Sequence, residues 1–277
     1  MPDEAEAPPA HVLAGFGVPA DGTSMARPVR LVGGEGTSWL AAGMVFKPAG
    51  DTAFAAYLAG LTHRIVERGF RVPRAVRSRD GRWVVAGWTA TQVVPGKESP
   101  SRVDEIIRVG QAYHIALADE RRPPLLAGRD DPWAYADRVA WGEEPVVGDD
   151  RVYRLQSELA VVRRPVSMRC QLVHGDLCAN VLFAAGEPPS VLDLSPYWRP
   201  VAWALAVVVV DGITWYGADL SVLDRWSHLP EWNQMLVRAA MFRLGAYEGQ
   251  LRRGVDLTAD LYRWEPTVEL LCRRAHR

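Results

Sequence analysis

Polar side chains are concentrated in residues 174–180, HGDLCAN, between two apolar runs typical of β-strands. A loop of this composition is usually functional, because burying His, Asp and Asn is otherwise unfavourable. Asp193 follows in another apolar run. We predict Asp176 as a catalytic base and His174 as the catalytic-loop residue that braces it. Asn180 and Asp193 have the oxygen donors that suit Mg²⁺. Together these residues predict phosphoryl transfer.

Phosphoryl transfer also needs a cation for the phosphates, and Lys47 is the candidate. Lys47 and Lys97 are the only lysines among 32 basic residues. A chain that otherwise uses Arg keeps Lys where a compact ammonium on a flexible stem is needed. Residues 29–48 predict three short strands with Gly-rich turns, and Lys47 on the third. Backbone N–H groups in the first turn would face phosphate at Gly33, Gly34 and Gly36, although an ordinary hairpin turn remains the alternative.

The hydrophobic pattern predicts two domains that position these residues. Residues 1–28 are expected to form a tail leading into a short helix or strand, residues 29–96 a small β-rich lobe, and residues 97–277 a larger, mainly helical lobe. The small lobe should contain a helix at 51–68 and strands at 72–78 and 83–94. Gln92 and Val93 lie in the expected hinge, 91–96, and are predicted to contact a nucleotide. Helices of the larger lobe are predicted at 103–118, 132–141, 152–162, 200–216, 232–252 and 257–274.

The segments "HGDLCANVLF", "VLDLSPYWRP" and "AWALAVVVVDGITW" resemble the aminoglycoside phosphotransferase and choline kinase-like family. The similarity covers about residues 28–275 and is most specific at 172–200. It implies an α+β, bilobed protein-kinase-like fold, ATP (or GTP) with Mg²⁺ as cofactors, and a small-molecule hydroxyl as acceptor. The larger lobe supplies acceptor contacts in this family, so Asp211, Tyr197 and Trp198 are possible acceptor-pocket residues. A buried Asp paired with Arg, and an aromatic core, are the competing interpretations.

Two departures from the kinase pattern leave other functions open. Asp176 and Asn180 are four residues apart, whereas the kinase pattern has five. The predicted helix at 51–68 has no Glu in its interior to pair with Lys47, and Glu67 lies only at its end. The chain is therefore predicted to be a small-molecule kinase, with a kinase-like pseudoenzyme that binds nucleotide as the alternative. A metal-dependent phosphohydrolase using His174 and Asp176 is disfavoured, because the six His residues are scattered.

Composition narrows the class of protein and its partners. With 48% hydrophobic residues, 23% charged residues and a net charge of -1, the 277-residue chain should be globular and has no general field to attract nucleic acid or a membrane. The apolar run at 201–210 is half the length that spans a bilayer. Three unpaired cysteines and a polar, Pro-rich start predict a reduced, cytoplasmic protein. The oligomeric state is left open.

Overall fold

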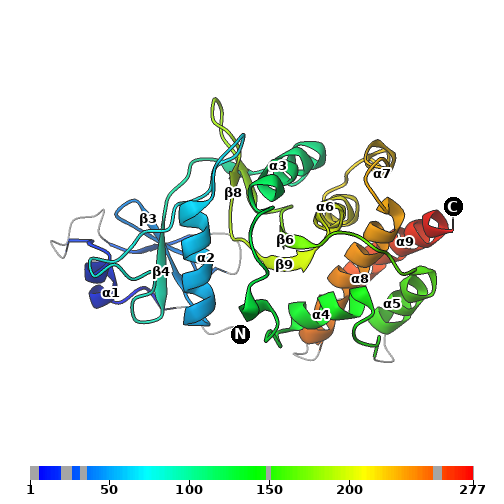
Figure 1. The fold of residues 1–277 in the computed structure, drawn as a ribbon, viewed down its shortest axis with the longest axis horizontal. Helices are drawn as coiled ribbons and strands as arrows, with labels where there is room; N and C mark the ends of the chain where they lie inside the picture. Colours follow the sequence, from blue (N-terminus) through cyan, green and yellow to red (C-terminus); the bar gives the residue numbers. More distant parts are fainter. Residues whose placement is uncertain (1–5, 20–26, 32–35, 148–150, 252–257, 277) are drawn as a thin grey trace. The chain divides into compact units, whose positions relative to one another are not determined.

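The computed structural model describes residues 6–19, 27–31, 36–147, 151–251 and 258–276 (Figure 1). The chain divides into two compact units. The smaller contains residues 1–96 and 183–192, and the larger contains residues 97–182 and 193–277. Each unit is considered by itself.

The smaller unit is built on an antiparallel sheet of four strands in the order β1-β2-β3-β4. The elements of this unit are α1 (Ala10–Gly15), β1 (Val29–Arg30), β2 (Trp39–Ala41), β3 (Met44–Pro48), α2 (Thr52–Arg64), β4 (Trp88–Gln92) and β8 (Ser190–Val191). Lys47 lies on β3, as the sequence predicts, and pairs with Thr89 of β4. The predicted helix at 51–68 is α2, whose N-cap Asp51 accepts a hydrogen bond of 2.9 Å from the Phe54 N–H.

The segment expected as an N-terminal tail contains α1, which contributes to the core of the smaller unit. Val12 of α1 is fully buried, and Phe16 contacts Phe46 of β3 edge to face with ring centroids 5.7 Å apart. Val18 belongs to the same apolar cluster. Three apolar side chains in seven residues are enough to anchor a short helix that could not be stable alone.

The predicted strand at 72–78 is wrong. This segment makes only isolated bridges, such as Ala75 with Thr91. Arg74 instead turns its guanidinium to the end of α2, where Nη1 donates to the carbonyl oxygens of Thr62 and Ile65 at 2.9 and 3.0 Å. These carbonyls have no partner within the helix, so capping them competes with a regular strand. Pro73 also removes a ladder donor.

The predicted strand at 83–94 is interrupted by a two-residue turn. Ala86 and Gly87 both have positive φ, 44° and 79°. Val85 and Trp88 exchange two backbone hydrogen bonds of 2.9 Å across them. This is the geometry of a tight hairpin, so only Trp88–Gln92 joins the sheet.

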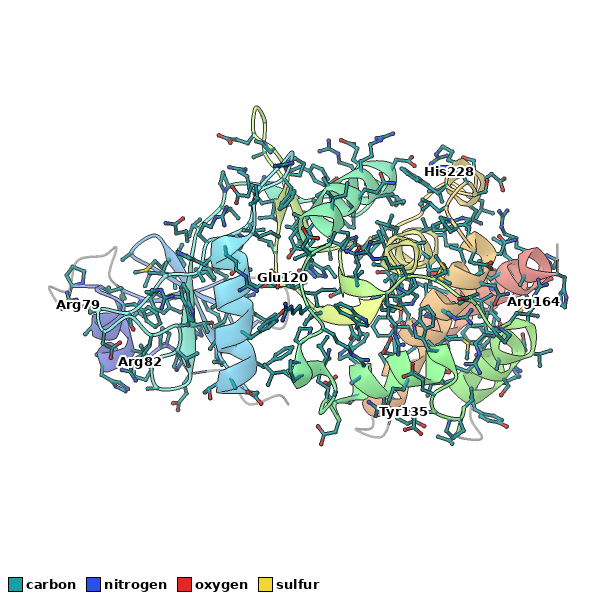
Figure 2. All side chains as sticks on the ribbon, in the orientation of Figure 1. Arg79, Arg82, Glu120, Tyr135, Arg164 and His228 are labelled. Carbon is teal, nitrogen blue, oxygen red and sulfur yellow. The ribbon has the colours of Figure 1, made fainter. Side chains whose placement is uncertain are left out.

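The turn predicted at 79–81 is present, between residues that do not form regular strands. Gly81 adopts φ +82°, and the Ser78 N–H donates to the Arg82 carbonyl at 2.9 Å. Asp80 accepts a hydrogen bond from the Ser78 hydroxyl at 2.5 Å and pairs with Arg82. Arg79 and Arg82 are exposed side chains of this unit (Figure 2).

The larger unit is mainly helical, and the predicted helices are all present. Its elements are β5 (Lys97–Glu98), α3 (Val103–Ala116), the 3-10 turn η1 (Pro124–Leu126), α4 (Pro132–Trp141), α5 (Arg151–Val162), β6 (Gln171–His174), β9 (Pro196–Arg199), α6 (Val201–Trp215), α7 (Val222–Arg225), α8 (Trp232–Leu251) and α9 (Thr258–Ala275), while β7 (Val181–Phe183) lies where the two units meet along the chain. Helix α8 packs against α4, α5, α6 and α9 (Figure 1).

Local sequence explains where these helices begin and end. Asp131 caps α4 by accepting from the Trp133 and Ala134 N–H groups, both at 3.1 Å, and Pro132 occupies the first turn. Gly142 ends the helix with φ +76°. Helix α6 is buried on almost every side, as its uniformly apolar sequence requires. Among the described residues, no helix is both long and apolar enough to cross a membrane.

Candidate functional site

The HGD loop begins where β6 ends, in the larger unit. His174 is fully buried, and its backbone N–H donates to His114 Nε2 at 3.0 Å. His174 Nδ1 accepts from the Asp176 N–H at 3.1 Å. Antiparallel β9 pairs with β6, and the Gly175 N–H donates to the Ser195 carbonyl at 2.9 Å. His174 therefore holds the first turn of the loop by hydrogen bonds and does not face solvent.

Gly175 lets the loop approach an aromatic cluster closely. A Cβ at this position would lie 2.5 and 2.6 Å from two ring carbons of Tyr197 and 3.3 Å from Trp203. Gly110 of α3 has a similar role, since a Cβ there would lie 2.8 Å from the side chain of Leu177. Two glycines thus allow the loop to pack tightly from both sides.

The Asp176 carboxylate is the exposed group of the loop, with 43% of its side chain accessible. Its Oδ1 lies 2.6 Å from Arg243 Nη2, and its Oδ2 accepts from Asn180 Nδ2 at 3.1 Å. Burial by itself disfavours the charged form, but the nearby positive charge and hydrogen bond of Arg243, with His174 and Asn180, lower the pKa of Asp176 below its ordinary value. The carboxylate is therefore ionised at neutral pH and able to accept a proton or a hydrogen bond.

Asn180 is turned towards Asp176. Its Nδ2 donates to the Asp176 carbonyl at 2.7 Å as well as to the carboxylate, and its backbone N–H closes a turn with the Leu177 carbonyl at 2.9 Å. The turn accommodates the four-residue spacing. With the amide nitrogen bound to Asp176, the oxygen of Asn180 is the atom suited to a metal ion.

Asp193 follows β8 and is exposed, with a left-handed backbone at φ +42°. Asp tolerates this conformation better than most residues, and such backbone geometry is concentrated at functional sites. Within the described ranges, no three His, Cys, Asp or Glu side chains gather as a protein-only metal centre would require. A Mg²⁺ site built from one carboxylate, one amide oxygen, phosphate and water needs no such cluster.

Arg243 of α8 is the residue that sequence reasoning missed. It is 6% exposed, and its Nε donates to Asp211 Oδ1 at 2.8 Å while Nη2 contacts Asp211 Oδ2. Asp211 on α6 is only 2% exposed. Burial, partly opposed by Arg243, raises the pKa of Asp211 to about 6, so it is still mainly ionised at neutral pH. A single Arg within the apolar stretch 235–242 and its continuation was the available signal, because such a charge needs a buried partner.

The predicted acceptor-pocket residues do not surround a common ligand-sized pocket. Asp211 is closed off by Arg243, which is the competing interpretation of the sequence. Tyr197 is 5% exposed and packs edge to face against Trp203 and Phe242, with ring centroids 5.4 and 5.2 Å apart. Burial raises the pKa of the Tyr197 phenol. Tyr197 is therefore part of an aromatic core.

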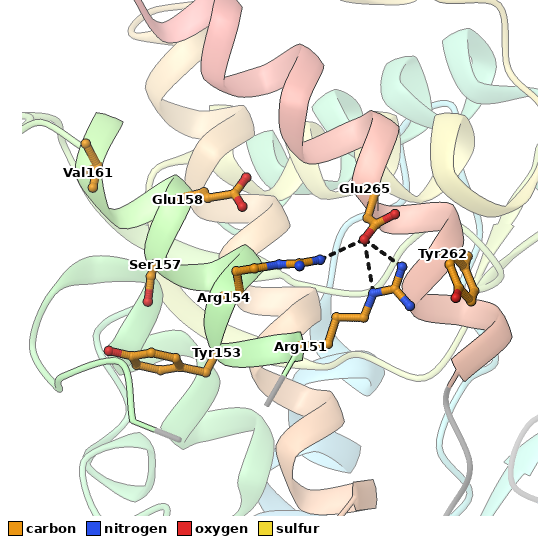
Figure 3. A pocket seen from close by; sticks show the side chains of 8 residues that line it. All are labelled: Arg151, Tyr153, Arg154, Ser157, Glu158, Val161, Tyr262 and Glu265. Carbon is orange, nitrogen blue, oxygen red and sulfur yellow. Dashed lines mark hydrogen bonds and ion pairs between the residues drawn. The ribbon is translucent and has the colours of Figure 1, made fainter. Parts of the chain in front are cut away.

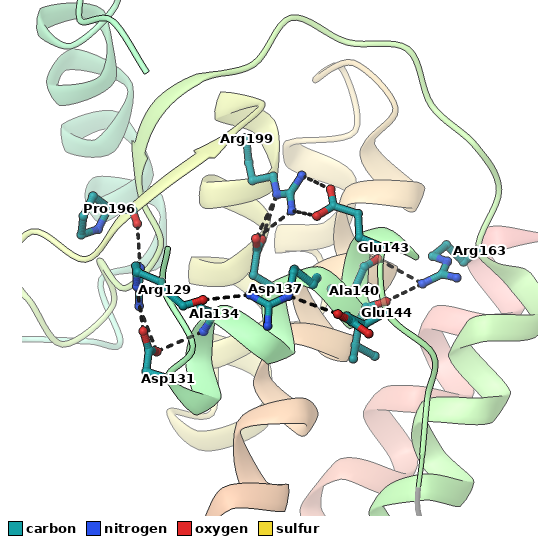
Figure 4. A network of polar contacts seen from close by, with 12 residues as sticks. Arg129, Asp131, Ala134, Asp137, Ala140, Glu143, Glu144, Arg163, Pro196 and Arg199 are labelled. Carbon is teal, nitrogen blue, oxygen red and sulfur yellow. Dashed lines mark hydrogen bonds and ion pairs between the residues drawn. The ribbon is translucent and has the colours of Figure 1, made fainter. Parts of the chain in front are cut away.

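Tyr197 and the half-buried Trp198 do line a small cavity of about 110 Å³. Pockets for small molecules usually measure about 300–1,000 Å³, so this cavity is too small for a sugar or nucleoside. An ion-pair network fills its surroundings, in which Arg199 binds both Asp137 and Glu143 at 2.7 Å (Figure 4). These charges satisfy one another and indicate a structural role.

A larger pocket of about 800 Å³ lies between α5 and α9 and contains none of the predicted site residues. Arg151 and Arg154 point to the same carboxylate of Glu265, at 2.6 and 2.8 Å (Figure 3). Arg151 also lies over the ring of Tyr262, 3.7 Å from its centroid. Its charged groups are paired, so the pocket has no feature of a phosphoryl-transfer site.

The predicted nucleotide-binding residues belong to the smaller unit. Lys47 is half-buried on β3. Gly33 and Gly34 lie outside the described residues, whereas Gly36 has φ +68° and its carbonyl accepts from Arg30 Nε at 2.7 Å. The remaining two, in the expected hinge, already use their backbone N–H groups: Gln92 donates to the Arg74 carbonyl at 2.9 Å, and Val93 to the Gly43 carbonyl at 3.2 Å.

Glu67 was the nearest carboxylate to the α2 end that could have served the cation on β3. It instead accepts from the Val72 N–H at 2.9 Å and pairs with Arg74 at 3.2 Å. Because α2 ends at Arg64, Glu67 lies in the following loop and stabilises the connection to residue 72.

A small β-rich unit and a larger helical unit carrying an HGD loop define an α+β, protein-kinase-like fold, and this predicted class is confirmed. The chain is similar to the aminoglycoside phosphotransferase of Alicyclobacillus acidocaldarius, with 15% identity, 99% of each chain covered and a TM-score of 0.55. It is also similar to a choline/ethanolamine kinase family protein of Mesorhizobium loti, with 17% identity, 94% and 93% coverage and a TM-score of 0.53.

A third similar structure is the amicoumacin kinase hAmiN in complex with AMP-PNP, Ca²⁺ and its antibiotic, at 14% identity, 90% and 87% coverage and a TM-score of 0.54. No protein-family model and no curated protein matches the sequence. The chain thus has the fold of the aminoglycoside phosphotransferases and choline kinases.

Proposed function

We propose that the protein is a phosphotransferase that moves the γ-phosphate of ATP, or of GTP, to a hydroxyl group of a small molecule. The observation that carries the proposal is the Asp176 carboxylate, ionised, 43% exposed and held through both oxygens at the centre of the HGD loop. The shared fold with small-molecule kinases supports it, since one of these binds a nucleotide analogue, a divalent cation and an acceptor together.

In the proposed reaction Asp176 accepts a hydrogen bond from the acceptor hydroxyl, orients its oxygen towards the γ-phosphorus and takes the proton as the new P–O bond forms. The bond between the γ-phosphorus and the bridging oxygen breaks, and ADP or GDP leaves with that electron pair. Asn180 and Asp193 would hold Mg²⁺, which supplies charge neutralisation on the phosphates. Lys47 would add its positive charge to the same anion.

The acceptor is proposed to be a sugar, aminosugar, nucleoside or similar hydroxyl compound. Relatives by fold act on aminoglycosides, choline and other antibiotics, so their acceptors differ widely. Asp211 is neutralised by Arg243 and offers no free carboxylate to a cationic acceptor. This pairing argues against a specific site for a polycation around α6.

A second function is a nucleotide-binding pseudoenzyme. One observation favours it: the Asp176 carboxylate is already engaged by Arg243 and Asn180, and such contacts reduce its basicity. Each carboxylate oxygen has a second lone pair, however, and the exposed side of Asp176 remains open to a hydroxyl.

Turnover of nucleotide with a panel of hydroxyl compounds, compared between wild type and Asp176→Asn, tests the proposal. We expect Asp176→Asn to lower the rate by about 10²–10⁴-fold, the contribution of a positioned base, while calorimetry shows nucleotide·Mg²⁺ binding unchanged. Asp219→Asn, at an exposed position of the same unit, is the matched control. Binding without turnover in the wild type would support the pseudoenzyme, and absence of both would refute the two functions.

A further inference from the structure

We propose that Arg243 is a positioning residue for Asp176, an inference that rests on the proposed function. Arg243 reaches from α8 to the HGD loop, and its Nη2 lies 2.6 Å from Asp176 Oδ1. The same nitrogen contacts Asp211 of α6. One guanidinium therefore links two helices of the core to the group that would receive the acceptor proton.

The guanidinium is itself held in place. Nε and Nη2 form a two-point contact with the two oxygens of Asp211, which is the geometry that fits a planar fork to a carboxylate. The guanidinium carbon lies 5.5 Å from the ring centroid of Phe242 and 5.7 Å from that of Trp133. Asp211 thus orients Arg243, and Arg243 in turn orients Asp176.

Asp176 needs this constraint because it is the more exposed member of the group. Its side chain is 43% accessible, whereas those of Arg243 and Asp211 are 6% and 3% accessible. A partly exposed carboxylate can rotate among several conformers, and only one points its free lone pair at the acceptor. Asn180 holds Oδ2 at 3.1 Å, but Asn180 belongs to the same loop and moves with it. Arg243 is the contact that ties the carboxylate to the rigid core.

Lysine cannot reproduce this arrangement. An ammonium is a point charge without the planar fork, so it can neutralise one carboxylate but cannot hold Asp211 at two points while also reaching Asp176. Arg243→Lys therefore keeps the charge of the site and removes its geometry. A role limited to charge neutralisation would survive this substitution, whereas a positioning role would not.

Arg238 provides a matched control on the same helix. It is 3% exposed, and its hydrogen bonds go to the Gln234 carbonyl and side chain at 3.1 and 3.0 Å and to the Arg164 carbonyl at 2.6 Å. Arg238→Lys also disturbs a buried guanidinium in α8, but the groups that it releases connect α8 to residues 162–164. Any loss common to both variants reports on the packing of α8.

The experiment measures kcat and KM for nucleotide in both variants, together with amide hydrogen exchange of residues 174–180. We expect Arg243→Lys to lower kcat by about 10–100-fold, the usual effect of removing a group that orients a catalytic residue, with KM for nucleotide little changed. Exchange in 174–180 should become faster. Arg238→Lys should retain kcat and the slow exchange of this loop, even if its melting temperature falls.

Equal kcat values and equal exchange rates in the two variants would overturn the inference. A lower kcat in Arg243→Lys without faster exchange in 174–180 would also overturn it, because the loop would then be held without Arg243. If the wild type shows no turnover, the proposed function fails, and hydrogen exchange alone decides whether Arg243 holds Asp176 in place.

Discussion

Replacing Gly175 by alanine places a methyl group where the structure has no room for it. The new Cβ would lie 2.5 and 2.6 Å from ring carbons of Tyr197, whereas carbon atoms pack best at about 3.5–4.0 Å. The loop or the ring must therefore move by roughly 1 Å. Tyr197 is confined by Trp203, Phe242 and Arg129, with the guanidinium 5.1 Å from the Tyr197 ring centroid, so the loop is the part that moves.

The expected cost has two parts. Overpacking of this kind lowers the free energy of unfolding by about 1–3 kcal/mol, which lowers the melting temperature of a chain of this size by about 2–10 °C. Displacing Asp176 by about 1 Å from its working position should lower kcat by about 100-fold. Gly175→Ala should thus impair catalysis more than its loss of stability explains.

Thermal unfolding followed by circular dichroism and steady-state phosphotransfer assays measure the two parts. Gly128→Ala is the control, because a Cβ at Gly128 meets no atom within 4 Å. Combining Gly175→Ala with Tyr197→Leu should restore part of the melting temperature, since the smaller side chain leaves space for the methyl group. A Gly175→Ala protein with the melting temperature and kcat of Gly128→Ala would refute the steric argument.

Two further predictions concern buried titratable groups of the larger unit. Burial, with the neighbouring His174, lowers the pKa of His114 to about 3, so the folded protein keeps this side chain neutral while the unfolded chain protonates it below pH ~6.5. Stability should therefore fall as the pH drops from 6.5 towards 3, by up to about 1.4 kcal/mol per pH unit from this group, and urea unfolding of His114→Gln, which keeps an acceptor, should show a correspondingly weaker dependence; equal slopes would contradict the assignment. Burial, followed by the charge of Asp211, raises the pKa of the Cys178 thiol, so iodoacetamide should modify the half-buried Cys170 well before Cys178 in the native protein, and peptide mapping that finds equal rates would contradict it.

Local sequence patterns predicted much of the larger unit correctly. Its helices follow from apolar residues at a spacing of three and four, because each helix buries one stripe against its neighbours. Asp131, Pro132 and Gly142 define the ends of α4 by interactions within one or two turns. The placement of Lys47 on a strand and of the HGD loop after β6 depends on equally short patterns.

Contacts between distant residues decided what the sequence left open. The strand expected at 72–78 is lost because Arg74 caps α2. Tyr197, a possible ligand contact from sequence, is enclosed by Trp203 and Phe242.

The sequence by itself determined the residue types for phosphoryl transfer, their order and the elements that carry them. Tertiary structure alone decided how Asp176 is held. Arg243 lies 67 residues from Asp176 and 32 from Asp211, so no local pattern pairs them. A buried guanidinium requires carboxylate partners, but which of the many Asp and Arg residues meet is determined only when α6 and α8 pack together.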